Sequence, residues 1–269
     1  MSRNASVLDA IVAAKRQEVD RLAPAARRLE AQAAAAVPAR DFRAALNRQT
    51  VAVIAEFKRR SPSAGWIREG AEVEPVLGVY AAAGVSAFSV LTDRDYFGGS
   101  LDDLAEARKV APVPVLRKDF LIDPVQVLEA RAAGADAVLL IVRILDDARL
   151  RELRVLAREL GMHALVEVHT AGEVERALRS GADVIGVNSR DLATFQANLD
   201  LVLELAYNTP PVTLLVGESG IRAPADVERL AEAGVDAVLI GETLMRAGTV
   251  DGIRPFTAVA RTWRGRAVL

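Results

Sequence analysis

The sequence predicts one α/β domain, a closed (βα)8 barrel (the TIM-barrel fold) with an N-terminal helical extension. Three observations lead to this prediction: a chain of 269 residues, an apolar content of 51%, and a phrase that recurs four times. Barrels of this kind need about 250 residues, and a chain in which half of the residues are apolar can form a substantial core. We place the extension at residues 1–48 and the barrel at residues 49–269, within a single domain.

The recurring phrase combines a glycine with a short apolar run. The glycine suits the left-handed end of a helix, and the apolar run suits a strand that is buried on both faces. Successive copies lie about 50 residues apart. The copies are AGVSAFSVLT (Ala83–Thr92), AGADAVLLIV (Ala133–Val142), SGADVIGVNS (Ser180–Ser189) and AGVDAVLIGE (Ala233–Glu242).

A βα unit needs only about 30 residues, so each interval has room for a second strand. The candidates are Val51–Lys58, Val113–Lys118, Ala164–His169 and Val212–Glu218. Helical segments separate the strands at 72–83, 101–110, 124–133, 146–160, 171–180, 199–207, 224–233 and 253–263. Strict alternation predicts parallel strands with right-handed crossovers. Eight units favour a closed barrel. An open doubly wound sheet is the alternative, although no G-x-G-x-x-G follows the first strand.

The residues before the first strand stand outside the repeat. Leu8–Leu22 has apolar residues at helical spacing, and an alanine-rich stretch ends at Pro38. We expect a helical extension packed on the barrel, with a flexible leader as the alternative.

Composition excludes several classes of function. Net charge is −2 with basic and acidic residues interspersed, which argues against a nucleic-acid partner. The absence of cysteine excludes disulfides and thiolate catalysis, and two histidines make a metal centre unexpected. The start of the chain lacks the apolar block of a signal peptide, and the longest apolar run is too short to span a bilayer. We expect a cytoplasmic protein without a membrane partner.

Polar residues stand where the predicted strands end, which is where active sites of this fold form. Glu56 and Lys58 share one face of the first strand, and both point inward if Ile54 does. Lysines among carboxylates shift one another's pKa and suit general acid–base catalysis. Alternatively, these strand-end residues are solvated at the rim of the barrel or form structural ion pairs, without a role in catalysis. The strand-end groups are Glu56–Lys58, Lys118–Asp119, Glu167–His169, Asn188–Arg190, Glu218–Gly220 and Gly241–Glu242.

Glycines in GESGI (Gly217–Ile221) and IGE (Ile240–Glu242) follow the seventh and eighth strands, where barrels commonly bind phosphate. Backbone N–H groups can approach an oxyanion closely there. The loop RRSPSAG (Arg59–Gly65) adds the donors Ser61, Ser63 and Lys58. Alternatively, the glycines end the strands for purely steric reasons, and the loop Arg59–Gly65 is a simple Ser-Pro turn.

Seven motifs in order identify the chain as similar to the indole-3-glycerol phosphate synthase family over nearly its whole length. They are IAEFKRRSPSAG (Ile54–Gly65), SVLTDRDYFGGSLDDL (Ser89–Leu104), PVLRKDFLIDPVQVLEARAAGADAVLLI (Pro114–Ile141), LVEVHT (Leu165–Thr170), IGVNSRDLATF (Ile185–Phe195), VGESGI (Val216–Ile221) and IGETLM (Ile240–Met245).

The resemblance implies ring closure of 1-(2-carboxyphenylamino)-1-deoxy-D-ribulose 5-phosphate with loss of CO₂ and water, in tryptophan biosynthesis and without a cofactor. Lys118 corresponds to the general acid toward the substrate ketone, and Glu167 to the base in the dehydration. Lys58 would contact the substrate carboxylate or phosphate. We expect a monomer, with a homodimer as the alternative. The implied catalytic residues are Glu56, Lys58, Lys118, Glu167, Asn188 and Ser219; the implied substrate-binding residues are Ser61, Phe97, Phe120, Arg190, Glu218, Gly220 and Gly241.

The chain departs from the family pattern at the phosphate end. Glu242 stands where some members have serine, and a carboxylate there would repel phosphate unless it is turned away. Arg60, Ala64 and Ser189 are smaller departures. Three alternative functions remain. One is a barrel that only binds a ligand or regulates a partner. The others are a phosphoribosylanthranilate isomerase, which would require a Cys/Asp pair, and a Schiff-base aldolase built on Lys118.

Overall fold

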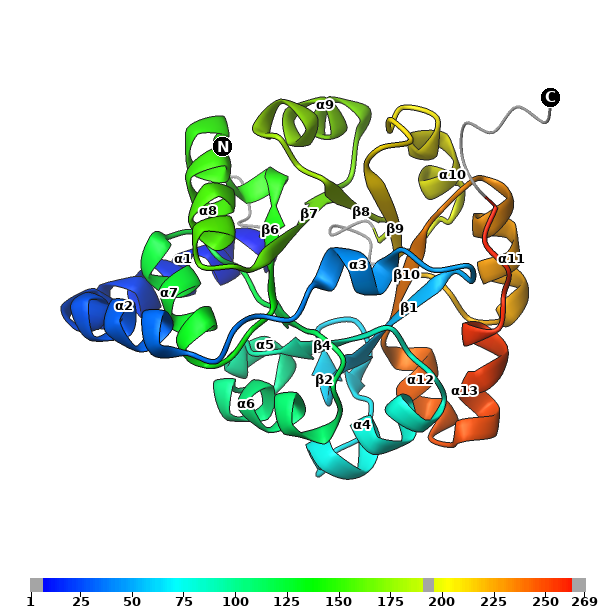
Figure 1. The fold of residues 1–269 in the computed structure, drawn as a ribbon, viewed down its shortest axis with the longest axis horizontal. Coiled ribbons are helices and arrows are strands. Elements are labelled where there is room, and N and C mark those ends of the chain that lie inside the picture. Colours follow the sequence, from blue (N-terminus) through cyan, green and yellow to red (C-terminus); the bar gives the residue numbers. More distant parts are fainter. Residues whose placement is uncertain (1–6, 191–195, 263–269) are drawn as a thin grey trace, which may run out of the picture.

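The computed structural model describes residues 7–190 and 196–262, in which eight parallel strands close into a barrel (Figure 1). The first strand pairs with both the second and the last, so the alternative of an open sheet is wrong. In chain order the strands are β1 (Ala52–Phe57), β4 (Ala87–Leu91), β5 (Val115–Lys118), β6 (Ala137–Ile141), β7 (His163–Val168), β8 (Val184–Asn188), β9 (Leu214–Glu218) and β10 (Ala237–Ile240).

Helices surround the barrel between successive strands, and seven of the eight expected segments agree with the structure to within one residue. The repeat glycines Gly84, Gly134, Gly181 and Gly234 all have positive φ near the helix ends, as the repeat predicts. The surrounding helices are α4 (Val73–Ala82), α6 (Leu101–Val110), α7 (Pro124–Ala132), α8 (Asp147–Glu159), α9 (Ala171–Ser180), α10 (Asp200–Ala206), α11 (Pro224–Glu232) and α13 (Val250–Thr257).

The expected bounds of the last helix, 253–263, are wrong. The helix starts at Val250, because the Thr249 side chain accepts a hydrogen bond from the backbone N–H of Gly252 and caps it. It ends at Thr257, because the following residues pair with the segment before β1, where the Val51 N–H donates to the Val259 carbonyl at 2.9 Å.

Several short elements were not expected, and most follow a strand's C-terminal end. In α5, the Asp93 carboxylate accepts from the Tyr96 N–H and caps the helix, and Gly98 ends it with positive φ. These elements build the rim of the barrel mouth. They are β2 (Arg60–Ser61), β3 (Gly65–Trp66), α5 (Arg94–Phe97), η2 (Val142–Ile144) and α12 (Glu242–Ala247).

The N-terminal extension is helical and packs on the barrel beside α7, as expected (Figure 1). The alternative of a flexible leader is wrong from Val7 onward. Its elements are α1 (Val7–Leu22), η1 (Ala23–Ala25), α2 (Ala26–Ala35) and α3 (Phe42–Leu46). Among the described residues, no helix is long and apolar enough to cross a membrane.

The barrel interior is a separate apolar cluster from the layer between strands and helices. It contains Ile54, Leu116, Leu165 and Leu239, together with Phe42 of α3. Ile54 therefore points inward, and the alternation of side chains carries Glu56 to the same face, as expected. At the C-terminal ends of the strands, charged side chains follow these apolar layers.

Candidate active site

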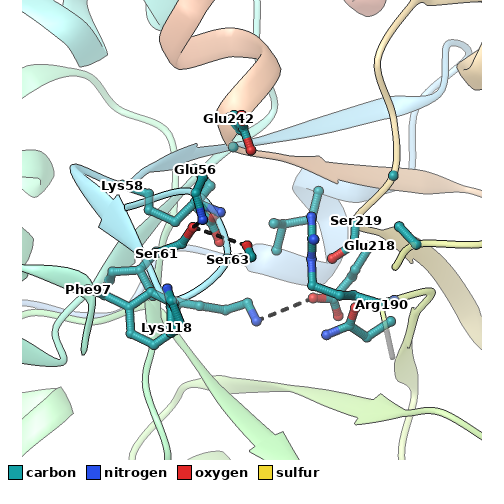
Figure 2. Close-up of a pocket in the computed structure, with 18 of the residues that line it drawn as sticks. Glu56, Lys58, Ser61, Ser63, Phe97, Lys118, Arg190, Glu218, Ser219 and Glu242 are labelled. Atoms are coloured by element: carbon teal, nitrogen blue, oxygen red, sulfur yellow. Dashed lines mark hydrogen bonds and ion pairs between the residues drawn. The ribbon is translucent and has the colours of Figure 1, made fainter. Parts of the chain in front are cut away.

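A cavity of about 1120 Å³ opens at the C-terminal ends of the strands (Figure 2). Every residue predicted for the site lines it, so the structure brings the whole set together. These are Glu56, Lys58, Ser61, Phe97, Lys118, Phe120, Glu167, Asn188, Arg190, Glu218, Ser219, Gly220 and Gly241.

Two lysines and three carboxylates form the floor of the cavity. The Lys118 ammonium lies 3.0 Å from Glu167 Oε2 and 3.4 Å from Glu218 Oε2. The Lys58 ammonium, directly after β1, lies 2.6 Å from Oε1 of Glu56 on β1. All three carboxylates are at least 95% buried, so the lysines compensate charge that water does not reach.

Burial and neighbouring charge give these groups different ionisation states. Burial opposes the charged form of Lys118, but Glu167, Glu218 and Glu56 raise its pKa overall. Burial also opposes ionisation of Glu167, yet Lys118 and His169 hold its pKa below the usual value. Burial, with the charges of Glu167 and Glu56, raises the pKa of Glu218 to about 8. At neutral pH the site therefore holds a cationic Lys118, an ionised Glu167 and a largely protonated Glu218.

An aromatic wall borders the charged floor. The rings of Phe97 and Phe120 lie 6.1 Å apart between centroids, tilted by 36°. Leu8 and Ile11 of α1 also line the cavity, a contribution of the extension that the sequence reasoning missed. Their helical spacing as one apolar stripe was the signal that could have shown it.

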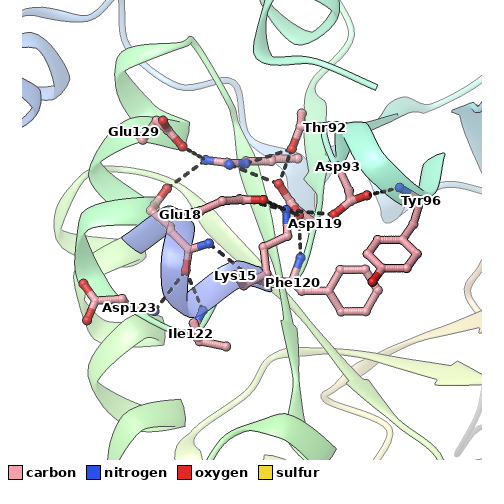
Figure 3. Close-up of polar contacts among 12 residues, drawn as sticks. Lys15, Glu18, Thr92, Asp93, Tyr96, Asp119, Phe120, Ile122, Asp123 and Glu129 are labelled. Atoms are coloured by element: carbon pink, nitrogen blue, oxygen red, sulfur yellow. Dashed lines mark hydrogen bonds and ion pairs between the residues drawn. The ribbon is translucent and has the colours of Figure 1, made fainter. Parts of the chain in front are cut away.

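A buried lysine ties α1 to this wall (Figure 3). Lys15, 1% exposed, lies 2.9 Å from Asp93 Oδ2 and 2.8 Å from Asp119 Oδ1. Asp93 caps the helix that carries Phe97, and Asp119 stands between Lys118 and Phe120. The sequence reasoning missed Lys15 as well, although a lysine on an apolar helical stripe was a visible signal.

The phosphate end of the cavity is formed by loops with unusual backbone geometry. Ser219 and Gly220 both have positive φ, 67° and 76°. Ser61 Oγ accepts from the Ala64 N–H at 3.1 Å, which orders the loop after β1. The Asn188 side chain accepts from the Arg190 N–H at 3.0 Å.

Glu242 lies at the edge of the group, apart from the charged floor (Figure 2). Its carboxylate accepts hydrogen bonds from Arg246, at 3.0 and 2.9 Å. The negative charge of Glu242 is therefore paired with Arg246 and does not face the phosphate loops uncompensated. Arg222 and Arg246 also line this end of the cavity. The sequence reasoning missed both, because nothing local distinguishes them from other surface arginines. Within the described ranges, no cluster of three or more His, Asp or Glu side chains could hold a metal ion.

The barrel and the lysine–carboxylate floor together define an acid–base enzyme of the (βα)8-barrel class. The family profile described as indole-3-glycerol phosphate synthase matches residues 8–254, and the chain belongs to this family. The last five residues of the motif Ile185–Phe195 lie outside the described residues.

Curated relatives carry the same description. An indole-3-glycerol phosphate synthase of Desulfotalea psychrophila is 46% identical, covering 96% of this chain and 98% of its own length. Indole-3-glycerol phosphate synthase 2 of Streptomyces coelicolor is 53% identical, covering 80% of this chain and 84% of its own. Among solved structures, 3-hexulose-6-phosphate synthase from Salmonella typhimurium is similar with a TM-score of 0.62 at 16% identity, covering 77% of this chain and 97% of its own; this similarity concerns the fold alone.

Proposed function

We propose that the cavity closes the indole ring of 1-(2-carboxyphenylamino)-1-deoxy-D-ribulose 5-phosphate with loss of CO₂ and water. The observation that carries the proposal is the Lys118–Glu167 pair, 3.0 Å apart beneath the aromatic wall of Phe97 and Phe120. Such a pair places a cationic proton donor and an ionised base side by side, so that both can reach one bound substrate.

In this proposal Lys118 donates a proton to the substrate ketone oxygen as the arene carbon attacks the carbonyl carbon. Departure of CO₂ restores the aromatic ring. Glu167 then takes the proton of the ring nitrogen, and a lysine ammonium of the cavity floor protonates the hydroxyl group, which leaves as water. Burial of the two side chains strengthens both interactions, because it reduces the competition from water.

The remaining residues bind and orient the substrate. Lys58, held by Glu56, contacts the substrate carboxylate or phosphate, and Asn188 and Ser219 hold polar groups near the reacting carbons. Phe97 and Phe120 stack against the anthranilate ring. Further contacts to substrate come from Arg190 and Glu218, and contacts to phosphate from Ser61, Gly220 and Gly241.

We also propose that residues 1–48 and 49–269 form one domain, which acts as a cytoplasmic monomer without a cofactor. The contacts of α1 with the aromatic wall support a single functional unit.

A fluorescence assay for indole formation tests the activity directly. Purified protein, given verified substrate and no added cofactor, is expected to produce the indole. If verified substrate gives no indole, the proposal is wrong.

Replacement of the general acid tests the assignment within the site. Lys118→Ala is expected to lower kcat by about 10²–10⁴-fold with the circular dichroism spectrum unchanged. Lys109→Ala, at an exposed position on α6, is the matched control and should retain full turnover. Retained turnover in Lys118→Ala would move the acid role to Lys58.

A further inference from the structure

A buried histidine stands directly behind the proposed base. His169 follows β7, two residues after Glu167, and is 6% exposed. It does not line the cavity, and in the described residues neither ring nitrogen has a hydrogen-bond partner. A buried polar group without a partner is uncommon and calls for an explanation.

The imidazole lies between two carboxylates, one at each ring nitrogen. Nε2 is 3.6 Å from Glu167 Oε1, and Nδ1 is 3.5 Å from Glu173 Oε2. Glu173 is itself fixed: it accepts the His169 backbone N–H at 2.6 Å and pairs with Arg143 at 3.2 Å. The other oxygen of Glu167 is bound to Lys118.

Only the doubly protonated ring presents an N–H to both carboxylates; a neutral ring directs a lone pair at one of them. The distances from the ring nitrogens of His169 to the two carboxylates, 3.6 and 3.5 Å, are those of ion pairs rather than hydrogen bonds. Contacts of this kind are often long in a free enzyme and shorten when substrate binds.

We propose that His169 is a positioning residue for Glu167: as an imidazolium held by Glu173, it fixes and keeps ionised the carboxylate that acts as base. This inference rests on the proposed function, because it assigns a partner to the base of that reaction.

The charges around the pair are consistent with this role. Lys118 on β5 faces Glu167 from the cavity side. Glu173 on α9 faces His169 from behind, and Arg143 on η2 pairs with Glu173. The pKa of Glu173 is held at about 2, against the effect of burial, by contact with His169 and Arg143. The charges therefore alternate in sign from Lys118 to Arg143, through Glu167, His169 and Glu173.

Kinetics of His169→Leu test the role. We expect kcat to fall about tenfold with KM within twofold, and the acid limb of the kcat profile to move up by about one pH unit. The sign follows because loss of a neighbouring cation makes a carboxylate harder to ionise. Glu173→Gln should shift both quantities in the same direction, and it serves also if His169→Leu does not fold.

The matched control is His163→Leu, which removes the other histidine at the opposite end of the same strand, where it pairs with Asp41. It should leave kcat and the acid limb unchanged. If His169→Leu and Glu173→Gln keep kcat within twofold and an unmoved acid limb, His169 only fills space and the inference is wrong.

A measurement independent of turnover uses ¹⁵N NMR of the histidine side chains. With His163→Leu leaving a single histidine, we expect both ring nitrogens of His169 to be protonated at pH 7. A singly protonated ring would overturn the inference. If the wild-type protein forms no indole, the proposed function fails, whereas this spectrum still decides the charge of His169.

Discussion

At the scale of single residues, Glu167 and Glu218 differ in ionisation because they lie at unequal distances from the same cation, Lys118. Lys118 lies 3.0 Å from Glu167 and 3.4 Å from Glu218, and it cannot neutralise both. Glu167 also has His169 nearby, whereas Glu218 Oε1 is buried without a hydrogen-bond partner in the described part of the chain. Glu218 therefore keeps its proton, whereas Glu167 is ionised.

This difference predicts a dependence of stability on pH. The pKa of Glu218 is raised to about 8 in the folded state, against an ordinary value of 4.5. A raised pKa contributes stability that is fully present below the unfolded value and is lost as pH rises through the folded value. We expect the free energy of unfolding to fall between pH 5 and 8 in wild type, and to fall less in Glu218→Gln.

Urea unfolding across that pH range provides the measurement. Glu242→Gln, at an exposed carboxylate on the rim, is the control and should follow the wild-type curve. Parallel curves for wild type and Glu218→Gln would contradict the proposed protonation of Glu218.

At the scale of elements, the N-terminal extension forms part of the cavity wall. One stripe of α1 places Leu8 and Ile11 at the cavity and Lys15 against Asp93 and Asp119 (Figure 3). The helix thereby holds α5 and the loop after β5 in place, because both aspartates also bond to backbone N–H groups there.

Removing the cation should destabilise the protein strongly. Lys15→Met leaves buried carboxylates without it, and we expect a loss of about 3 kcal/mol in the free energy of unfolding. Arg16→Met, on the exposed side of the same helix, should change it by less than about 0.5 kcal/mol. Chemical denaturation measures both, and equal effects would show that Lys15 contributes no more than a surface residue.

At the scale of the whole molecule, two glycines leave room for two of the buried carboxylates, Glu218 and Glu56. A Cβ on Gly186 of β8 would clash with Glu218 Oε1, and one on Gly241 would clash with Glu56 Oε1. Gly186 lies on β8 and Gly241 directly follows β10, whereas Glu218 lies on β9 and Glu56 on β1. The charged floor therefore depends on the arrangement of the entire barrel.

Gly186→Ala tests this packing. The backbone of Gly186 has no positive φ, so the added methyl group acts through the displaced Glu218. We expect a loss of about 1–3 kcal/mol in stability together with a lower kcat. Gly78→Ala on α4, where a Cβ meets nothing within 4 Å, should lose neither. Thermal unfolding and the indole assay provide the two readouts; an unaffected Gly186→Ala would mean that Glu218 moves without cost.

Much of the fold could be predicted from local patterns. The repeated glycine and apolar run marks a helix end followed by a buried strand, which is a property of neighbouring residues. The gathering of Lys118, Glu167 and Glu218 in one cavity followed too, because the C-terminal ends of parallel strands meet at one edge. Their roles in the reaction remain predictions.

The sequence by itself thus determined the barrel, the order of its strands and helices, and a set of site residues that all line the cavity. Only the tertiary structure decided which charged side chains are paired: Lys15 with Asp119, His169 with Glu167 and Glu173, and Glu242 with Arg246. Periodicity reports which face a residue occupies. Partners, and the ionisation states that follow from them, depend on distances between side chains, most of them on separate elements, and those distances exist only once the barrel has closed.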